Sequence, residues 1–210
     1  MTRLLVGIGT ALSFGIMLMS GNGSAELHVS ATGTDTPMLF VSDRCGASCD
    51  SMRDGLAARF DFEELDAFDN GVGTTLYDRH GGFGRFPYVV IGEQRIVGND
   101  PGAIISAIAI EYGDWQLPVE EREALGRHFD ADGNPQFVMY QTETCGYCDK
   151  ARDYLAGRGI TPVEYNIEHD LEARRDYDAL QGMGTPLIYR GFERVQGFNI
   201  AGLEPLIDAE

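Results

Sequence analysis

Basic residues are scarce in this sequence. Lysine and arginine together number 16 against 33 aspartates and glutamates, which gives a formal net charge of −17 at pH 7. A field of that sign repels the phosphates of nucleic acids and anionic membrane surfaces. We therefore expect no nucleic-acid partner and no membrane-surface partner. Neutral or basic partners are favoured, although solubility alone would explain the charge.

Long hydrophobic runs are confined to the N-terminus. Arg3 is followed by a largely apolar stretch over residues 4–19 and by small residues that end at Ala25. That order is typical of a bacterial export signal, so we assign residues 1–25 to a cleaved signal peptide and the rest to the periplasm or the medium. An uncleaved membrane anchor is the alternative, because the run approaches the length of a short span. No cysteine lies at the cleavage site, which argues against a lipoprotein.

Cysteine is sparse as well, and its four residues form two close pairs, Cys45/Cys49 and Cys145/Cys148. Exported proteins commonly use cysteine for structural disulfides, but a bridge across so few residues closes a tiny loop and stabilises little. A zinc site would need two further ligands, and neither half has a second close pair of cysteines or histidines. The spacing favours redox chemistry, and we predict no metal site.

The sequence repeats at the level of topology. A buried-strand pattern precedes the first cysteine of each pair, at residues 38–41 and 137–140. From that cysteine to Pro87 is 42 residues in the first half, and to Pro186 it is 41 in the second. A glycine follows each proline by 11 residues. Three agreeing intervals indicate duplicated domains rather than a solenoid.

Both halves predict the element order β-α-β-α-β-β-α. In the first half the second helix, near residues 72–80, is short, and the last helix has Asp100 as its cap and Pro101 as its first residue. A short helix is expected over residues 120–128, between the halves. The elements expected in the second half are a strand at 137–140, helices at 148–156 and 171–180, the latter capped by Asp170, a strand at 162–167, a hairpin of 187–189 with 194–196, and a last helix capped by Asn199.

The second pair lies where a strand runs into a helix. This order puts Cys145 at the helix N-terminus, where free N–H groups and the macrodipole favour the thiolate, the species that attacks disulfides. Cys148 lies one turn further on the same face, within bridging distance. We predict that Cys145 is the nucleophile and that the more enclosed Cys148 is the resolving thiol.

Three motifs of the second half carry a family resemblance: Tyr140 to Cys148, Gly184-Thr185-Pro186 and Gln196-Gly197-Phe198. With them, residues 137–207 resemble a glutaredoxin, within the thioredoxin-fold superfamily. The resemblance implies a cis bond before Pro186, which leaves the Thr185 backbone free to pair with an extended substrate. The substrate-binding residues that it implies are Tyr147, Thr185, Pro186, Gly197 and Phe198.

The resemblance also implies the fold. We expect an α/β protein of two tandem thioredoxin-like (glutaredoxin-like) domains, each with a central four-stranded mixed sheet flanked by helices. The first half matches more loosely. The expected boundaries are residues 36–113 for the N-terminal domain with its CxxxC pair, 114–134 for a connector, and 135–210 for the C-terminal glutaredoxin-like domain.

Some positions depart from the family pattern. Gly-Tyr separates the second pair where glutaredoxins usually have Pro-Tyr, and the same dipeptide occurs in periplasmic disulfide isomerases. Glu143 precedes the motif and Asn199 follows Phe198, where the family's glutathione site commonly uses basic side chains and an acidic or hydroxyl residue. Glutathione is an anion, as is this protein. Glutathione therefore stays open as a co-substrate, and no other cofactor is expected.

The first pair has three intervening residues, and this i, i+4 spacing still keeps both thiols on one helix face. Pro87 matches Pro186 and is a candidate for substrate binding, but Phe86 stands where a hydroxyl residue precedes the second proline. We interpret Cys45 and Cys49 either as a second redox site or as a static disulfide in a domain kept for docking.

The function predicted is that of an exported thiol-disulfide oxidoreductase that exchanges its Cys145/Cys148 dithiol with protein disulfides or small thiols, with a redox partner protein as a further candidate. Its direction is left open. A non-catalytic binding module with inert disulfides is the main alternative, and a metal chaperone using paired thiolates is another. The four histidines, which are His28, His80, His128 and His169, are expected to be solvated, and Trp115 is expected to pack between the domains.

Overall fold

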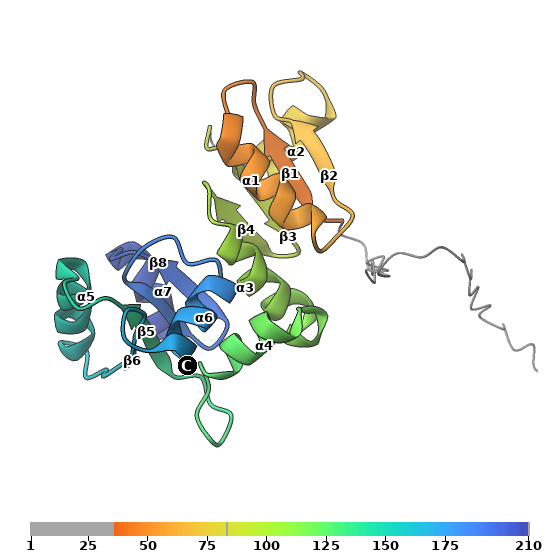
Figure 1. Ribbon diagram of the computed structural model, residues 1–210. Helices are drawn as coiled ribbons and strands as arrows, with labels where there is room; N and C mark the ends of the chain where they lie inside the picture. Colours follow the sequence, from red (N-terminus) through yellow and green to blue (C-terminus); the bar gives the residue numbers. More distant parts are fainter. Residues whose placement is uncertain (1–35, 83, 210) are drawn as a thin grey trace, which may run out of the picture.

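The computed structural model describes residues 36–82 and 84–209, so the expected signal peptide lies outside the described residues. No helix within those ranges is long and apolar enough to cross a membrane. Two α/β units follow one another along the chain (Figure 1). The first comprises β1 (Met38–Val41), α1 (Gly46–Ala57), β2 (Glu63–Asp66), α2 (Val72–Arg79), β3 (Tyr88–Ile91), β4 (Gln94–Val97) and α3 (Pro101–Tyr112).

A connector with two short helices leads into the second unit. The connector helices are η1 (Asp114–Gln116) and α4 (Val119–Gly126). The second unit comprises β5 (Phe137–Gln141), α5 (Gly146–Ala156), β6 (Val163–Asn166), α6 (Leu171–Ala179), β7 (Leu187–Arg190), β8 (Glu193–Gln196) and α7 (Ile200–Asp208).

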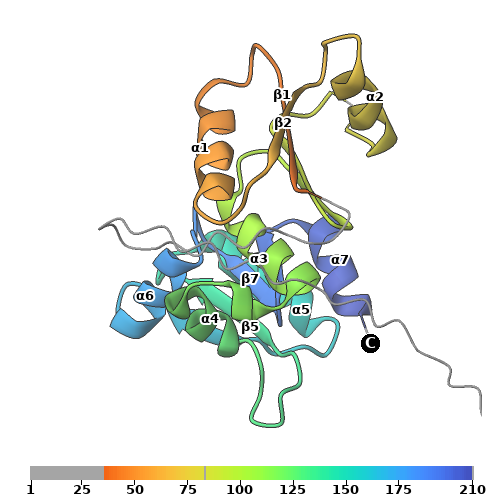
Figure 2. The same cartoon turned by 90° about the vertical axis from the view of Figure 1, so that its right-hand side faces the viewer.

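The two sheets have the same topology. Their strand orders are β2-β1-β3-β4 and β6-β5-β7-β8. In each, the first strand pairs in parallel with the second and antiparallel with the third, and the last two form a hairpin. Helices α1 and α2 lie on opposite faces of the first sheet (Figure 2). The predicted fold, two tandem thioredoxin-like domains with four-stranded mixed sheets, is confirmed.

The repeat extends to side-chain packing. Gly82 donates its N–H to the carbonyl of Tyr77 at 3.0 Å, and Gly182 donates to the carbonyl of Tyr177 at 2.9 Å. In each unit the tyrosine ring lies so close to the glycine that a Cβ there would overlap it. The second helix of each domain therefore ends with the same packing of a glycine on a tyrosine ring. The intervals in the sequence did not predict this repetition.

Helix α3 joins the two domains. An ordinary surface helix has one apolar stripe, but Gly102 and residues 104–109 of α3 are all buried, as expected of a helix covered on every side. It packs on α1 and β3 of its own domain and on β8 of the next. One cluster of buried hydrophobic residues therefore runs through both domains, and Ile105 and Ile108 share it with Val138 and Tyr189.

His128, expected to be solvated, is completely buried at the end of the connector. Its Nδ1 lies 3.1 Å from the Gly191 carbonyl oxygen and its Nε2 lies 3.1 Å from the Tyr140 hydroxyl. The ring also stacks on Tyr189 with centroids 4.1 Å apart. Burial lowers the pKa of His128 to about 3, so the imidazole is neutral and acts as a polar core residue. The prediction was wrong because these partners lie far away in the sequence.

Trp115 is the second correction. It was expected to pack between the domains, but its side chain is 67% exposed. The indole lies against the backbone at Gly113 instead. The interface that it was expected to fill is already closed by α3 and β8.

Candidate active site

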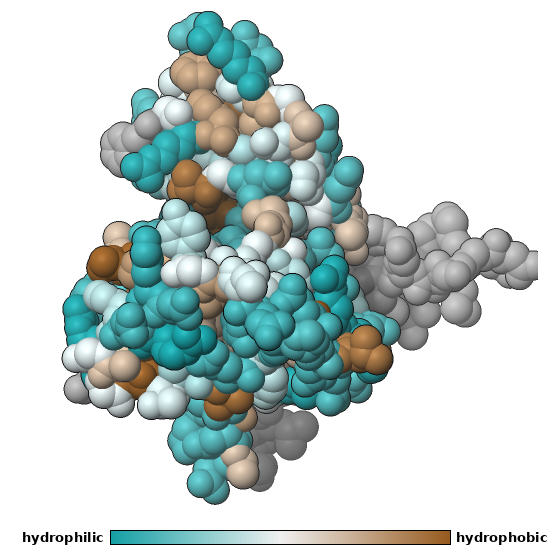
Figure 3. All heavy atoms as spheres, turned by 60° about the vertical axis from the view of Figure 1, so that its left-hand side comes forward, coloured by the Kyte–Doolittle hydropathy of each residue, from teal (hydrophilic) through white to brown (hydrophobic). Residues whose placement is uncertain are grey.

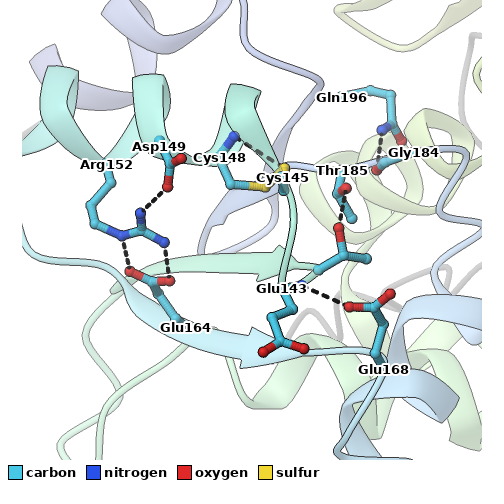
Figure 4. The surroundings of a disulfide bond; sticks show 11 residues. Glu143, Cys145, Cys148, Asp149, Arg152, Glu164, Glu168, Gly184, Thr185 and Gln196 are labelled. Atoms are coloured by element: carbon cyan, nitrogen blue, oxygen red, sulfur yellow. Dashed lines mark hydrogen bonds and ion pairs between the residues drawn. A yellow bond between two sulfur atoms is a disulfide. The ribbon is translucent and has the colours of Figure 1, made fainter.

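Cys145 and Cys148 form a disulfide at the start of α5, with Cα atoms 5.1 Å apart. Cys145 is the N-cap residue, and its Sγ accepts a hydrogen bond from the Cys148 N–H at 3.1 Å (Figure 4). Cys145 is half-buried, while Cys148 is 1% exposed and packs in the core of the second domain. Cys145 is thus the more exposed member of the pair, and the helix N-terminus is aimed at its sulfur.

The loop before β7 lies beside this pair, on the side away from Arg152 in Figure 4. The Thr185–Pro186 peptide bond is cis. The Thr185 Oγ1 lies 3.3 Å from the Thr142 Oγ1, which ties the loop to the segment that leads from β5 to Cys145. Among the described residues, the backbone N–H and C=O of Thr185 have no hydrogen-bond partner. An extended chain could therefore pair with this edge.

Gln196 of β8 fixes the same loop through two hydrogen bonds. Its side-chain amide donates to the Gly184 carbonyl at 2.7 Å and accepts from the Met183 N–H at 3.2 Å. The Gly197 N–H donates to the Pro186 carbonyl at 2.8 Å. The resemblance motif Gln196-Gly197-Phe198 includes this segment, but the two amide contacts of Gln196 could not be derived from sequence.

The remaining predicted substrate-binding residues differ in their positions. Tyr147 is exposed just after the first cysteine of the pair, with the Lys150 Nζ 4.9 Å from its ring centroid. Phe198 is half-buried and packs edge-on against Tyr154 in the core of the domain. Tyr147 is therefore open to solvent beside the pair, whereas Phe198 serves mainly in packing.

The outer rim of this site is acidic. The Glu143 N–H donates to a carboxylate oxygen of Glu168 at 2.7 Å, and the Glu143 carboxylate lies 3.1 Å from the His169 Nε2. All three side chains are exposed. The pairing of Glu168 and His169 with Glu143 was not predicted from the sequence. A negative rim disfavours an anionic substrate beside Cys145.

An arginine anchors each cysteine-bearing helix to the edge strand of its sheet. Arg152 of α5 bonds Asp149 at 2.8 Å and Glu164 of β6 at 2.7 Å (Figure 4). Arg53 bonds two acids of α1 and β2 in the same way in the first domain. Neither contact was predicted, although the recurrence of Asp-x-x-Arg after both pairs is a usable sequence signal.

Cys45 and Cys49 form the other disulfide, with Cα atoms 5.4 Å apart. Cys45 is the N-cap residue of α1 and is half-buried, while Cys49 is buried. Gly46, which follows Cys45, has a φ of +51°, a conformation that glycine adopts readily. The peptide bond before Pro87 is cis, as it is before Pro186. The two pairs therefore occupy equivalent places in their domains.

Two hollows of the described surface lie near the first cysteine pair and at the domain interface. One, of about 920 Å³, has Cys45, Arg44, Phe68 and Phe86 in its lining. The other, of about 600 Å³, lies between the domains and is lined by residues of β4, α3, β8 and α7. Figure 3 shows hydrophobic atoms in the recess between the two domains. The first hollow has a cysteine in its lining, and the second has Met183 and Gln196, which belong to or contact the loop before Pro186.

Comparisons with known proteins find glutaredoxin-like sequences and structures. The glutaredoxin family model matches residues 137–193. An uncharacterised glutaredoxin-like 8.6 kDa protein of Clostridium pasteurianum is 32% identical over 71 residues, which are 33% of this chain and 95% of that protein. The glutaredoxin of Archaeoglobus fulgidus is 21% identical with a TM-score of 0.32, covering 35% of this chain and 87% of its own. A buckwheat glutaredoxin in complex with glutathione is 17% identical with a TM-score of 0.32, covering 42% and 83%.

Proposed function

The chain belongs to the glutaredoxin family, and from this premise we propose that Cys145 and Cys148 are the reactive dithiol of a thiol-disulfide oxidoreductase. The observation that carries the proposal is the partly exposed Cys145 at the N-terminus of α5, with Cys148 buried one turn behind it. A structural disulfide would have no need of one exposed sulfur at a helix N-terminus, because it stabilises by joining distant segments.

The exchange proceeds through a mixed disulfide. The Cys145 thiolate attacks one sulfur of a substrate disulfide, whose S–S bond breaks, and the other substrate sulfur leaves as a thiolate that takes up a proton. The Cys148 thiolate then attacks the Cys145 sulfur and releases the second substrate thiol. Two electrons pass from the dithiol to the substrate, and the Cys145–Cys148 disulfide remains. The same steps in reverse oxidise a substrate dithiol.

Two features of the fold stabilise the thiolate form of Cys145. The first is the end of the helix macrodipole, and the second is the hydrogen bond that the Cys148 N–H directs at the Cys145 sulfur. Hydrogen bonds to an ionised acceptor are stronger than neutral ones, so both features favour thiolate over thiol. Cys145 therefore attacks as a thiolate in the first step, and in the second step its sulfur, by then part of the mixed disulfide, is attacked by Cys148.

A protein disulfide fits this site better than glutathione does. The free backbone edge at Thr185 suits an extended peptide, and the exposed Tyr147 can pack against its side chains. The Glu143 and Glu168 carboxylates would repel the carboxylates of glutathione. We propose protein disulfides as the main substrates, in the periplasm or outside the cell as the export signal in residues 1–25 indicates.

Trapping the mixed disulfide tests this proposal. The Cys148→Ser variant lacks the resolving thiol, so Cys145 should stay bonded to its substrate and give a covalent adduct on non-reducing gels. The matched Cys145→Ser variant should give none, and reduction should release the substrate from the first variant. A chain that forms no adduct through Cys145 would be a binding module with an inert disulfide.

N-terminal sequencing of the exported protein tests cleavage after Ala25.

A further inference from the structure

We propose that the hollow beside Cys45 binds an aromatic side chain next to the reacting cysteine of an extended peptide, which makes the first domain a second exchange site with its own sequence preference. This inference rests on the proposed function, because it assumes that the chain exchanges disulfides. It assigns to the Cys45/Cys49 pair a preference for peptides with an aromatic residue next to the cysteine, which the Cys145/Cys148 pair does not share.

Two phenylalanines form the wall of the hollow. Phe68, just after β2, is 59% exposed, and its ring centroid lies 5.5 Å from that of Phe86. Phe86 is half-buried and stacks on Tyr77 with centroids 5.0 Å apart and planes within 12°. An exposed phenylalanine beside a second ring offers apolar area to a further aromatic group, which gains from offset or edge-on contact.

The wall is fixed in place by polar contacts at its back. The Tyr77 hydroxyl accepts from the Arg85 N–H at 2.7 Å and donates to the Arg85 carbonyl at 3.0 Å, which holds the backbone just before Phe86. The Phe68 N–H donates to the Asp66 carboxylate at 2.8 Å. A site whose shape exists before binding loses less conformational entropy when a ligand enters.

The wall lies where a peptide would present its side chains. Cys45 lines the same hollow, so a substrate cysteine bonded to it would be held at the wall's edge. The Phe86–Pro87 bond is cis, and among the described residues the Phe86 backbone has no hydrogen-bond partner. A peptide paired there as an added strand would run along the edge that carries Cys45 and Phe86, so a side chain next to its cysteine would lie within reach of Phe68.

The second domain lacks this wall. Glu168 follows β6 by two residues, as Phe68 follows β2, and Thr185 precedes the cis-proline where Phe86 does in the first domain. A carboxylate and a hydroxyl replace the two rings. The aromatic preference should therefore belong to Cys45 alone, which makes Cys145 an internal control within the same molecule.

The test uses the full chain with both resolving cysteines replaced, Cys49→Ser with Cys148→Ser, so that Cys45 and Cys145 compete for one reagent. The reagents are two short peptides whose cysteine is joined to 5-thio-2-nitrobenzoate, one with phenylalanine and one with glycine beside the cysteine. Attack by a protein thiolate forms a protein–peptide disulfide, breaks the reagent disulfide and releases the coloured thiolate. Mass spectrometry of proteolytic fragments then gives the ratio of adduct at Cys45 to adduct at Cys145.

We expect that ratio to be roughly tenfold higher for the phenylalanine peptide than for the glycine peptide, as partial burial of one aromatic side chain would give. Phe68→Ala, at an exposed position, should bring the two ratios to within about twofold of each other. Val119→Ala, an exposed change in the connector, should leave the preference intact. If circular dichroism shows that Cys49→Ser does not fold, Cys49→Ala replaces it.

Equal ratios for the two peptides would overturn the inference, as would the absence of any adduct at Cys45 or a preference that survives Phe68→Ala. Each of these results would leave the adduct at Cys145 in place. Failure of the proposed function would look different, because Cys145 would then react with neither peptide.

Discussion

Arg194 of β8 bonds the carboxylate of Asp100, the N-cap residue of α3, at 2.9 Å across the boundary between the two domains. The Arg194 side chain is 3% exposed, and its guanidinium also donates to the Leu180 carbonyl at 2.8 Å and to Gln196 at 3.0 Å. Gln196 in turn holds the carbonyl of Gly184 before the cis-proline. A chain of polar contacts therefore runs from the first domain to the loop before Pro186 in the second.

Loss of the interdomain ion pair should destabilise the protein strongly. In the Arg194→Met variant the Asp100 carboxylate loses its partner in a largely buried interface, and such changes cost about 3–5 kcal/mol. Urea unfolding should show this as a lower midpoint. The control is Arg174→Met, which removes an exposed pair with Asp178 and should change the midpoint little. Similar midpoints for the two variants would show that the Arg194 pair adds no stability.

His128 should make stability fall in acid. Its pKa is about 3 in the folded protein and about 6.5 when unfolded. Below pH 6.5 the unfolded chain therefore binds a proton that the folded chain does not, so stability present above that pH is lost as the pH falls toward 3, by up to about 1.4 kcal/mol per unit.

The measurement is the free energy of unfolding between pH 7 and pH 4 for wild type and His128→Gln. The variant should be less stable at pH 7, but its stability should fall less steeply toward pH 4. His169→Gln, at an exposed position, should follow the wild-type slope. Parallel curves for wild type and His128→Gln would show that His128 is not buried in the neutral form.

Cys145 should react with alkylating agents faster than Cys148 once the disulfide is reduced. Cys145 is half-buried and lies at the N-terminus of α5, whereas Cys148 is 1% exposed. A brief pulse of iodoacetamide at pH 7 followed by mass spectrometry should show at least about tenfold more label at Cys145, given the reactivity of exposed thiolates. Faster labelling of Cys148 would reverse the assignment of nucleophile and resolving thiol.

Gln196→Ala should impair substrate binding more than chemistry. Without the Gln196 side-chain amide, Gly184 and Met183 lose the contacts that fix the loop before Pro186, so the backbone edge that we propose as the peptide site becomes mobile. For a protein disulfide substrate we expect KM to rise by about five- to tenfold with a smaller change in kcat. Glu193→Ala, at the exposed start of the same strand, is the control. A fall in kcat with KM unchanged would contradict this positioning role.

Local signals in the sequence predicted much of the fold. Asp100 and Asp170 were expected to cap helices, and each accepts backbone N–H bonds from the first turn, because capping depends on residues only two or three positions apart. Asn199 occupies its expected cap position, but its side chain makes no capping bond. The paired intervals between cysteine, proline and glycine predicted the tandem domains, since each interval is fixed by the same elements.

Features that depend on distant partners were not predictable. His128 is buried only because β5 and β7 provide Tyr140, Tyr189 and the end of a hairpin around it. Arg194 is held by a residue of the other domain, and no local pattern marks it. Phe68 stands out only once Phe86 is placed beside it by the loop before Pro87.

The initial rate at which the fully reduced chain reduces a protein disulfide tests most directly whether Cys145 is the reacting thiol. The rate should be measured for wild type, Cys145→Ser and Cys45→Ser under the same conditions, with a substrate that has no aromatic residue beside its cysteines. We expect Cys145→Ser to lose at least about 99% of the rate, as removal of a nucleophile does, and Cys45→Ser to keep most of it. A Cys145→Ser variant as fast as wild type would contradict the proposed function.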